Sequence, residues 1–275
     1  RDGQVRPGRL ELGAEGEQGG DVHGNGDREV RRGGPARGEA VRDDATHPAE
    51  RARLRLAIRR MRRVIADRLT RSWTSPPHFT ITVAVDVTAV LALRTELRAA
   101  GTNLTVTDFV LAAAAQTLAE FPDVNARTDG LSVWPRRRVH LGLAVSVAGG
   151  LVVPVIRNAD RLPLADLVRH RSELVQRARA GKSLPQDFDG GAFTLSNLGG
   201  FRVDSFDAIL NPPQATILAV GRILERPFVE DGQVRAVPTM KLSLSVDHRV
   251  LDGAAGARFL DKIIGLIEAP TQALS

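Results

Sequence analysis

Four side chains that can carry charge stand between apolar residues in the segment SVDHRVLDG, residues 245–253. Among them His248 has an unperturbed pKa close to neutral pH, so it can act as a general base toward a thiol or a hydroxyl. An alternating apolar run precedes it and a glycine follows, which predicts the end of a strand before a turn and a helix. Reacting groups gather at such strand ends in α/β sheets.

The spacing alone leaves a charged structural turn and a catalytic base equally open. A metal site would need a third ligand, and no further histidine or glutamate follows at a useful spacing, so we predict no metal. A serine hydrolase would need a Gly-x-Ser-x-Gly turn, which the sequence lacks. The chain has no cysteine, so a cysteine nucleophile, a disulfide and a zinc–thiolate site are excluded.

The other five histidines have structural interpretations. His23 and His47 lie in a polar N-terminal segment and are expected to be solvated. His170 stands between two arginines of a predicted helix, which favours a surface position. His78 and His140 begin predicted strands, where a hydrogen-bonded core or interface histidine is the more frequent case.

The composition is basic, with a formal net charge of +6 and a pI near 10.9. Nine arginines fall between residues 51 and 71, but no aromatic residues interleave with them as a base-stacking surface would need. We therefore predict no nucleic-acid partner. No run of about 18 apolar residues and no signal peptide is present, so we predict no membrane association.

The chain divides into a leader and one domain. Residues 1–53 are rich in glycine and charge, cannot bury enough apolar surface to become ordered, and carry too many acids for a transit peptide. Since the chain starts at Arg1, we expect a fragment or a processed product. Residues 54–275 mix helical and strand patterns and predict an α/β domain. The predicted helices are 54–73, ended by Pro76 and Pro77, 88–100, 107–121 with Thr107 or Asp108 near its N-cap, 162–182 with Gly181 at C′, and 253–269. The predicted strands are 78–88, two strands in 140–156 joined at Gly149-Gly150, 192–199, 215–223 and 239–248.

The motif DHRVLDG resembles the signature of the dihydrolipoamide acyltransferases, the core components of 2-oxo acid dehydrogenase complexes. The resemblance covers roughly residues 54–270 and extends over seven blocks in the family's order, the last of which contains this motif. These blocks are MRRVIADRLTRS with PHFTITVAVDVTAVLALR, TDFVLAAAAQTLAEFPDVNA, GLVVPVIRNAD, DFDGGAFTLSNLG, ILNPPQATILAVGRI and LSLSVDHRVLDGAAGARFL. The resemblance implies the fold of chloramphenicol acetyltransferase, a coenzyme A-dependent acyltransferase sandwich with a mixed sheet and flanking helices.

The resemblance also implies the chemistry. His248 would take the proton of the coenzyme A thiol, and the thiolate would attack the acyl carbon of S-acyl-dihydrolipoamide. Ser196, in the strand motif TLSN, would donate to the resulting oxyanion from a neighbouring subunit of a trimer. Asp252 would orient the turn by pairing with an arginine, while Asp247 and Arg249 would stabilise it. The segment Asn211–Gln214 would lie near the coenzyme A channel; the residues that bind the coenzyme A phosphates stay unknown.

The resemblance implies an acetyl group of the pyruvate type, with a branched-chain acyl group as the alternative. It implies a homotrimer, a core of 24 or 60 subunits, and decarboxylase and dihydrolipoamide dehydrogenase partners. The only lysines are Lys182, Lys241 and Lys262, so the lipoyl group would come from another chain or from a missing N-terminal domain. We expect the bacterial cytoplasm, with the mitochondrial matrix as the alternative. Rival interpretations are an inactive structural core and an acetyltransferase for a small alcohol or amine.

Overall fold

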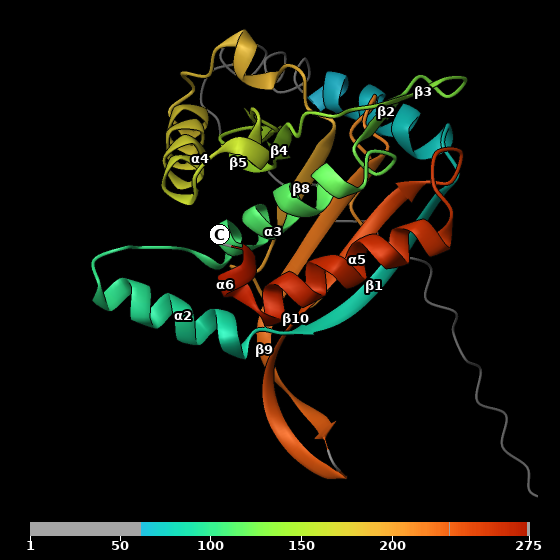
Figure 1. Cartoon of the computed structure of the whole chain (residues 1–275). Coiled ribbons are helices and arrows are strands. Elements are labelled where there is room, and N and C mark those ends of the chain that lie inside the picture. Colours follow the sequence, from blue (N-terminus) through green and yellow to red (C-terminus); the bar gives the residue numbers. More distant parts are fainter. Residues whose placement is uncertain (1–61, 231, 274–275) are drawn as a thin grey trace, which may run out of the picture. The chain divides into compact units, whose positions relative to one another are not determined.

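A six-stranded mixed sheet organises the part of the chain that the computed structural model describes, residues 62–230 and 232–273 (Figure 1). The predicted leader, and the start of the first predicted helix, lie outside those residues. The strand order is β1-β10-β9-β8-β4-β7, with β8 parallel to both of its neighbours and the other pairs antiparallel. The strands are β1 (His78–Asp86), β10 (Gln233–Asp247), β9 (Thr216–Glu230), β8 (Phe193–Asn197), β4 (Leu141–Leu143) and β7 (Val155–Ile156).

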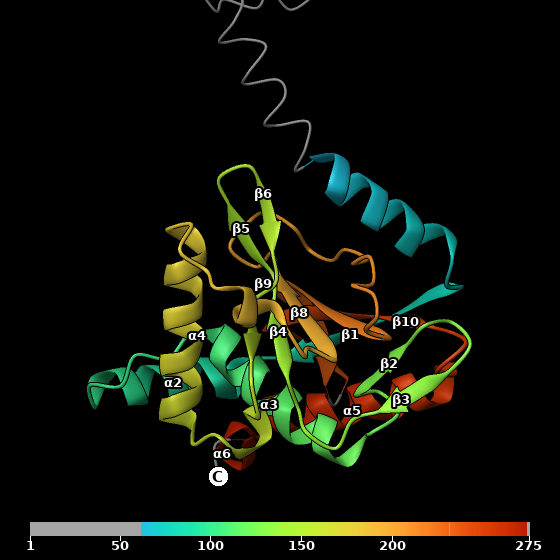
Figure 2. The same ribbon diagram turned by 90° about the horizontal axis from the view of Figure 1, so that it is seen from above.

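The predicted helices are confirmed where the structure describes them. The first covers residues 62–74 and stops before the proline pair at 76–77. Helix α5 packs across β1 and β10, α3 and α2 pack on α5, and α4 lies against β5 and β7 (Figures 1 and 2). The other helices are α2 (Thr88–Ala99), α3 (Val106–Glu120), α4 (Leu164–Arg179), α5 (Gly253–Glu268), α6 (Pro270–Ala273) and the 3₁₀ helices η1 (Ala159–Arg161) and η2 (Pro185–Phe188). No helix of the described residues is long and apolar enough to span a membrane.

The two faces of the central sheet differ in chemistry. The face under α5 is apolar, and the ring of Phe259, which is fully buried, meets Phe121 and Phe193 there. The opposite face carries hydroxyl groups. The Thr82 and Ser243 hydroxyls are hydrogen-bonded across β1 and β10 at 2.8 Å, and those of Thr80 and Ser245 at 3.2 Å. Because paired residues share a face, Ser196 on β8 lies on this side too, although β9, between β10 and β8, contributes the apolar Ala219 and Ile217.

The predicted hairpin in 140–156 is more divided than the sequence indicated. Strands β4 and β7 pair within the central sheet, whereas β5 (Val145–Val147) and β6 (Gly150–Val152) form a separate two-stranded sheet (Figure 2). The turn consists of Ala148 and Gly149, and Gly149 has a φ of 95°, which favours glycine. A further short pair, β2 (Ala126–Thr128) with β3 (Val133–Pro135), was not predicted.

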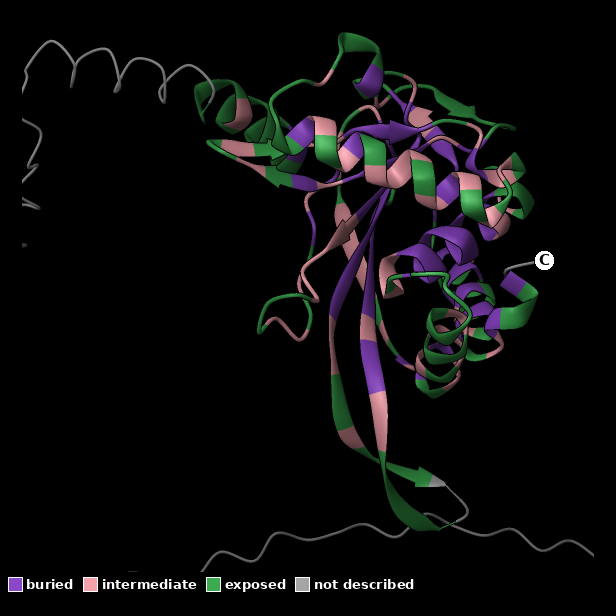
Figure 3. Ribbon diagram, turned by 90° about the vertical axis from the view of Figure 1, so that its left-hand side faces the viewer, coloured by how far each residue is buried: buried purple, intermediate pink, exposed green. Residues whose placement is uncertain are grey.

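Strands β9 and β10 are longer than predicted. They continue as a paired ribbon, residues 224–230 with 233–238, that projects from the body and is exposed at its end (Figure 3). Phe228, Val229 and Val234 are exposed on this ribbon. The sequence signal for it was the Asp-Gly dipeptide at 231–232, which suits a two-residue hairpin turn.

The ends of two helices are fixed by their flanking residues. The N-cap of α3 is Thr105, and Thr107 and Asp108 lie near it, in the first turn of the helix, as expected. Gly181 ends α4 as predicted, with a φ of 65°. Its N–H donates to Ala178 O and that of Lys182 to Arg177 O, the two bonds of a Schellman motif.

His140 lies in front of β4 and supports a strained residue. Its Nδ1 accepts the backbone N–H of Asn158 at 2.9 Å, and Asn158 is in the left-handed region with a φ of 51°. Burial lowers the pKa of His140 below its ordinary value of 6.5, and the charges of Arg157 and Arg138 act in the same direction. The Val139 backbone and Asp160 oppose this shift.

His140 should therefore make the fold less stable in mild acid. Because its folded pKa is depressed, its contribution to the free energy of unfolding is complete above pH 6.5 and is lost as pH falls below that value. Denaturant unfolding at pH 8 and pH 5.5 should show a larger loss for the wild type than for His140→Asn. Equal losses would remove His140 from this role.

Candidate active site

His248 follows the last residue of β10, and its ring nitrogens have no hydrogen-bond partner among the described residues. Its backbone N–H donates to Pro77 O at 3.0 Å, which ties the turn to the start of β1. Its ring packs against Phe79 with centroids 4.7 Å apart. The residue is exposed, and it makes no ion pair in the described part of the chain. An imidazole held at its base and open at its nitrogens can exchange a proton with a bound substrate.

The turn around His248 is stiffened by its two neighbours, as predicted. The Asp247 side chain is 2% exposed and pairs with the Arg249 guanidinium, with Nη2–Oδ2 at 2.7 Å and Nε–Oδ1 at 2.9 Å. The hydrogen bonds that Arg249 donates to the Asp247 carboxylate raise the pKa of Arg249 above its ordinary value. A Cβ on Gly130 would stand 2.7 Å from Arg249 Nη1, so a larger residue in the β2–β3 turn would require this guanidinium to shift.

Asp252 caps a helix, whereas the resemblance implied that it would pair with an arginine. It is the N-cap of α5, and its Oδ1 accepts the backbone N–H of Ala255 at 2.7 Å. Among the described residues it makes no ion pair with an arginine. Its carboxylate therefore fixes the start of α5, four residues after His248, by satisfying a free helix N–H.

Ser196 lies near the C-terminal end of β8 and lines an open cleft of about 390 Å³. The residue is partly exposed, and its hydroxyl has no hydrogen-bond partner among the described residues. The cleft also contains the guanidinium-bearing side chains of Arg171 and Arg179 and residues of the β5–β6 hairpin. A free hydroxyl beside cationic groups can donate to a developing oxyanion.

One chain does not bring His248 and Ser196 together. Ser196 is level with Ala219 on β9, which is level with Ser243 on β10. His248 lies five residues beyond Ser243, on a strand that runs antiparallel to β9. At about 3.4 Å per residue this is roughly 17 Å along the sheet, and the two intervening strand spacings add about 10 Å laterally.

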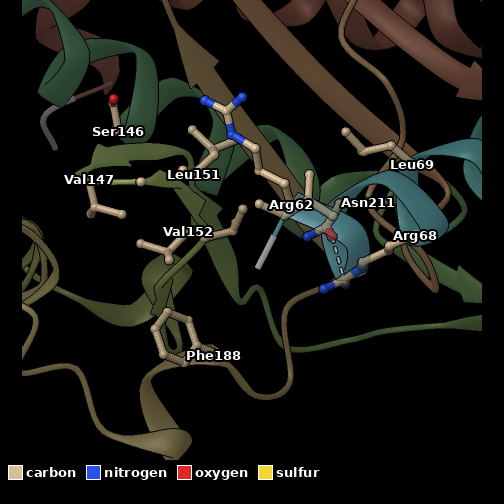
Figure 4. Close-up of a pocket in the computed structure, with 13 residues that line it drawn as sticks. Arg62, Arg68, Leu69, Ser146, Val147, Leu151, Val152, Phe188 and Asn211 are labelled. Atoms are coloured by element: carbon tan, nitrogen blue, oxygen red, sulfur yellow. Dashed lines mark hydrogen bonds between the residues drawn. The ribbon is translucent and has the colours of Figure 1, made fainter. Parts of the chain in front are cut away.

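A second, larger hollow adjoins the serine cleft. Its volume is about 760 Å³, and it lies between the helix at 62–74, the β5–β6 hairpin and Phe188 (Figure 4). Ser146 and Leu151 line both spaces, so the hollow and the cleft share a wall. Asn211, the first residue of the predicted channel segment, lines the hollow, and its Oδ1 accepts from Arg68 Nη2 at 2.8 Å.

Sequence reasoning missed the residues that support Ser196. Asn197 bonds to Thr107, and the fully buried Asp108 pairs with Arg171, so α3 and α4 are both connected to the cleft. The sequence held a usable signal, because Thr105-x-x-Asp108 before an apolar run is the pattern of a helix start. No group of three or more potential metal ligands occurs among the described residues.

Comparison with known proteins connects this geometry to one family. Residues 50–275 match the family model of the 2-oxoacid dehydrogenases acyltransferase (catalytic domain). The chain is 37% identical over 215 residues to the acetyltransferase component of the pyruvate dehydrogenase complex of Rickettsia felis, covering 76% of this chain and 52% of that protein. It is 40% identical over 223 residues to the mitochondrial component of Schizosaccharomyces pombe, covering 79% and 46%. The chain thus spans about half the length of these relatives.

Solved structures show the same likeness. The dihydrolipoamide acetyltransferase of Azotobacter vinelandii superposes with a TM-score of 0.74 at 36% identity, covering 78% of this chain and 91% of that one. In the Azotobacter protein, a serine, a histidine and an asparagine have been investigated for their role in the catalytic mechanism. That serine precedes the histidine by 52 residues, and the asparagine follows the histidine by four. The cubic core of the pyruvate dehydrogenase complex also superposes with a TM-score of 0.74, at 37% identity, covering 78% and 91%.

A chloramphenicol acetyltransferase superposes with a TM-score of 0.51 at 15% identity, covering 73% of this chain and 94% of that one. At this identity the likeness concerns the fold alone, and it confirms the predicted fold class. The match of the family model over residues 50–275 extends over the whole described structure. The chain belongs to the 2-oxoacid dehydrogenase acyltransferase family and carries its catalytic domain.

Proposed function

We propose that the chain transfers an acyl group, most simply acetyl, between S-acyl-dihydrolipoamide and coenzyme A within a 2-oxo acid dehydrogenase complex. The observation that carries this proposal is the spacing of three residues. Ser196 precedes His248 by 52 residues and Asp252 follows it by four, as do the serine and asparagine of the Azotobacter acetyltransferase. The free hydroxyl of Ser196 and the free ring of His248 suit the two roles that such a transfer requires.

His248 acts as the general base. It takes the proton from the coenzyme A thiol, because a thiol with a pKa near about 8.5 needs a base to become the thiolate nucleophile at neutral pH. The thiolate forms a bond to the acyl carbon, and the carbonyl electrons move onto oxygen, where the Ser196 hydroxyl donates. When the carbonyl re-forms, the bond to the dihydrolipoamide sulfur breaks, and that sulfur receives the proton from His248.

The separation of His248 and Ser196 within one chain supports a site between two subunits. We propose a homotrimer in which His248 of one subunit faces Ser196 of its neighbour, assembled further into a core of 24 or 60 subunits. The hydroxyl-bearing face of the sheet is suited to such a contact, because it contains Ser196 and leaves Thr82 exposed.

The larger hollow is the space that best suits coenzyme A. Its walls are apolar along the β5–β6 hairpin, which suits the pantetheine arm. Arg62 and Arg68 line it as cations for phosphate groups, although Nη2 of Arg68 already donates to Asn211 and Pro212. The thiol would lie at the end of the hollow that adjoins the serine cleft, where Ser146 and Leu151 line both spaces. The lipoyl group would come from another chain or from an N-terminal domain outside this sequence. The partners would be the decarboxylase and dihydrolipoamide dehydrogenase components, in the bacterial cytoplasm or, as the alternative, the mitochondrial matrix.

His248→Ala should abolish transfer because no other base replaces the imidazole. The test compares transfer from acetyl-coenzyme A and from isobutyryl-coenzyme A to free dihydrolipoamide, with oligomer size checked by light scattering. The faster donor identifies the acyl type. A wild-type protein that assembles but transfers neither group would instead be an inactive structural core, and an active His248→Ala would contradict the assignment of the base.

Ser196→Ala should lower kcat by about 10²- to 10³-fold, the usual cost of losing one oxyanion donor. The KM for coenzyme A should change little, because the hydroxyl acts on charge that develops during the reaction. Steady-state kinetics with both substrates measures this. An effect confined to the KM for coenzyme A would contradict the oxyanion role.

Asp252→Ala should lower the free energy of unfolding by about 1 kcal/mol, because α5 loses its N-cap. Asp252→Asn should leave both stability and kcat close to wild type, since an amide oxygen also caps a helix. Denaturant unfolding and kinetics of the two variants measure this. A large loss of kcat in Asp252→Asn would show that the charge itself takes part in catalysis.

A further inference from the structure

The side chain of Asn197, the residue after Ser196, makes two hydrogen bonds that restrain the backbone at the end of β8. Asn197 Nδ2 donates to Thr107 Oγ1 at 2.9 Å, across 90 residues of sequence. Asn197 Oδ1 accepts the backbone N–H of Gly199 at 2.7 Å. Because the oxygen is occupied by a backbone donor, the amide nitrogen has to face Thr107.

The turn after Ser196 is closely packed against its neighbours. A Cβ on Gly199 would stand 2.9 Å from Asn197 Oδ1 and 2.9 Å from Gly221 O. The Leu198 N–H also donates to Val220 O at 3.0 Å, so the segment after β8 is fixed against β9. The contact of Asn197 that a side-chain substitution elsewhere can remove is the one with Thr107.

Thr107 is itself held in place by an ion pair beneath it. The Asp108 carboxylate is fully buried and accepts from Arg171 Nε at 2.8 Å and Nη2 at 3.1 Å. It also accepts the N–H and the hydroxyl of Thr105, at 2.8 and 2.6 Å. These four bonds fix the first turn of α3, which carries Thr107. A buried carboxylate satisfied in this way resists displacement.

We propose that Thr107 and Asn197 are positioning residues that set the direction of the Ser196 hydroxyl toward the oxyanion. The Thr107–Asn197 bond joins the first turn of α3, braced by Asp108, to the end of β8. An oxyanion donor has to lie within a few tenths of an ångström of its productive place, so the restraint acts on catalysis rather than on substrate binding. This inference rests on the proposed oxyanion role of Ser196.

The test is a double-mutant cycle on the full chain. Thr107→Val keeps the shape of the side chain but removes the acceptor, and it should lower kcat about tenfold with the KM for coenzyme A and for dihydrolipoamide unchanged within about twofold. Thr107→Ser should restore kcat, because it returns the hydroxyl. In a Ser196→Ala background, Thr107→Val should lower kcat no further, because the group that it positions is gone.

Thr117→Val is the matched control. Thr117 lies in the same helix, is fully buried, and donates its hydroxyl to Ala113 O at 2.8 Å, away from the cleft. It should lower stability without changing kcat, so a general loosening of α3 is distinguished from the loss of the Asn197 contact.

Other outcomes would contradict the positioning role of Thr107 or the oxyanion role of Ser196. If the effects of Thr107→Val and Ser196→Ala on kcat multiply, or if Thr107→Val raises a KM, then Thr107 contacts a substrate directly or acts elsewhere. Either outcome would overturn this inference and leave the proposed function standing. A Thr107→Val with wild-type kcat would also overturn this inference alone. A Ser196→Ala with wild-type kcat would overturn the proposed oxyanion role and this inference together.

Discussion

The antiparallel pairing of β10 with β9 is the constraint on which the candidate site depends. It directs the end of β10, with His248, toward one edge of the sheet, while β8 runs parallel to β9 and carries Ser196 toward the opposite edge. Hydrogen bonds along two 15-residue strands fix this register, and a shift of one residue would turn the apolar face of β10 toward the polar side. The same pairing that builds the core therefore keeps His248 and Ser196, the two proposed catalytic groups, apart within one chain.

The surroundings of His248 and of Ser196 are arranged in the same way. In each, the proposed catalytic side chain has no hydrogen-bond partner among the described residues, while a residue next to it in the chain is tightly bonded. Asp247 and Arg249 hold the turn on either side of His248, and Asn197 with Thr107 holds the strand end beyond Ser196. A side chain that already made strong hydrogen bonds would have to break them to act on a substrate. Bonding its neighbours instead provides a defined position without that cost.

The sequence predicted the elements whose pattern is local. Alternating valines over β1, the apolar stripe of α5 and the glycine after α4 each depend on nearby residues, and all three are confirmed. The family motif also placed His248 after a strand. The ribbon of residues 224–230 and 233–238 was missed because its charges and two prolines have no clear strand period, and it is held by pairing rather than by burial. The Thr107–Asn197 bond joins residues 90 apart, so no local pattern could indicate it. The arginine expected for Asp252 likewise depended on distant packing, whereas its helix cap is local.

A mixing experiment tests most directly whether the site spans two subunits. Chains carrying His248→Ala and chains carrying Ser196→Ala are co-assembled in equal amounts, and transfer is measured against each variant alone. If His248 of one subunit works with Ser196 of its neighbour in a closed trimer, random assembly restores about one quarter of the sites, with activity well above either parent. Mixed trimers that show only the average activity of the two parents would contradict a shared site, and with it the role assigned to the strand register.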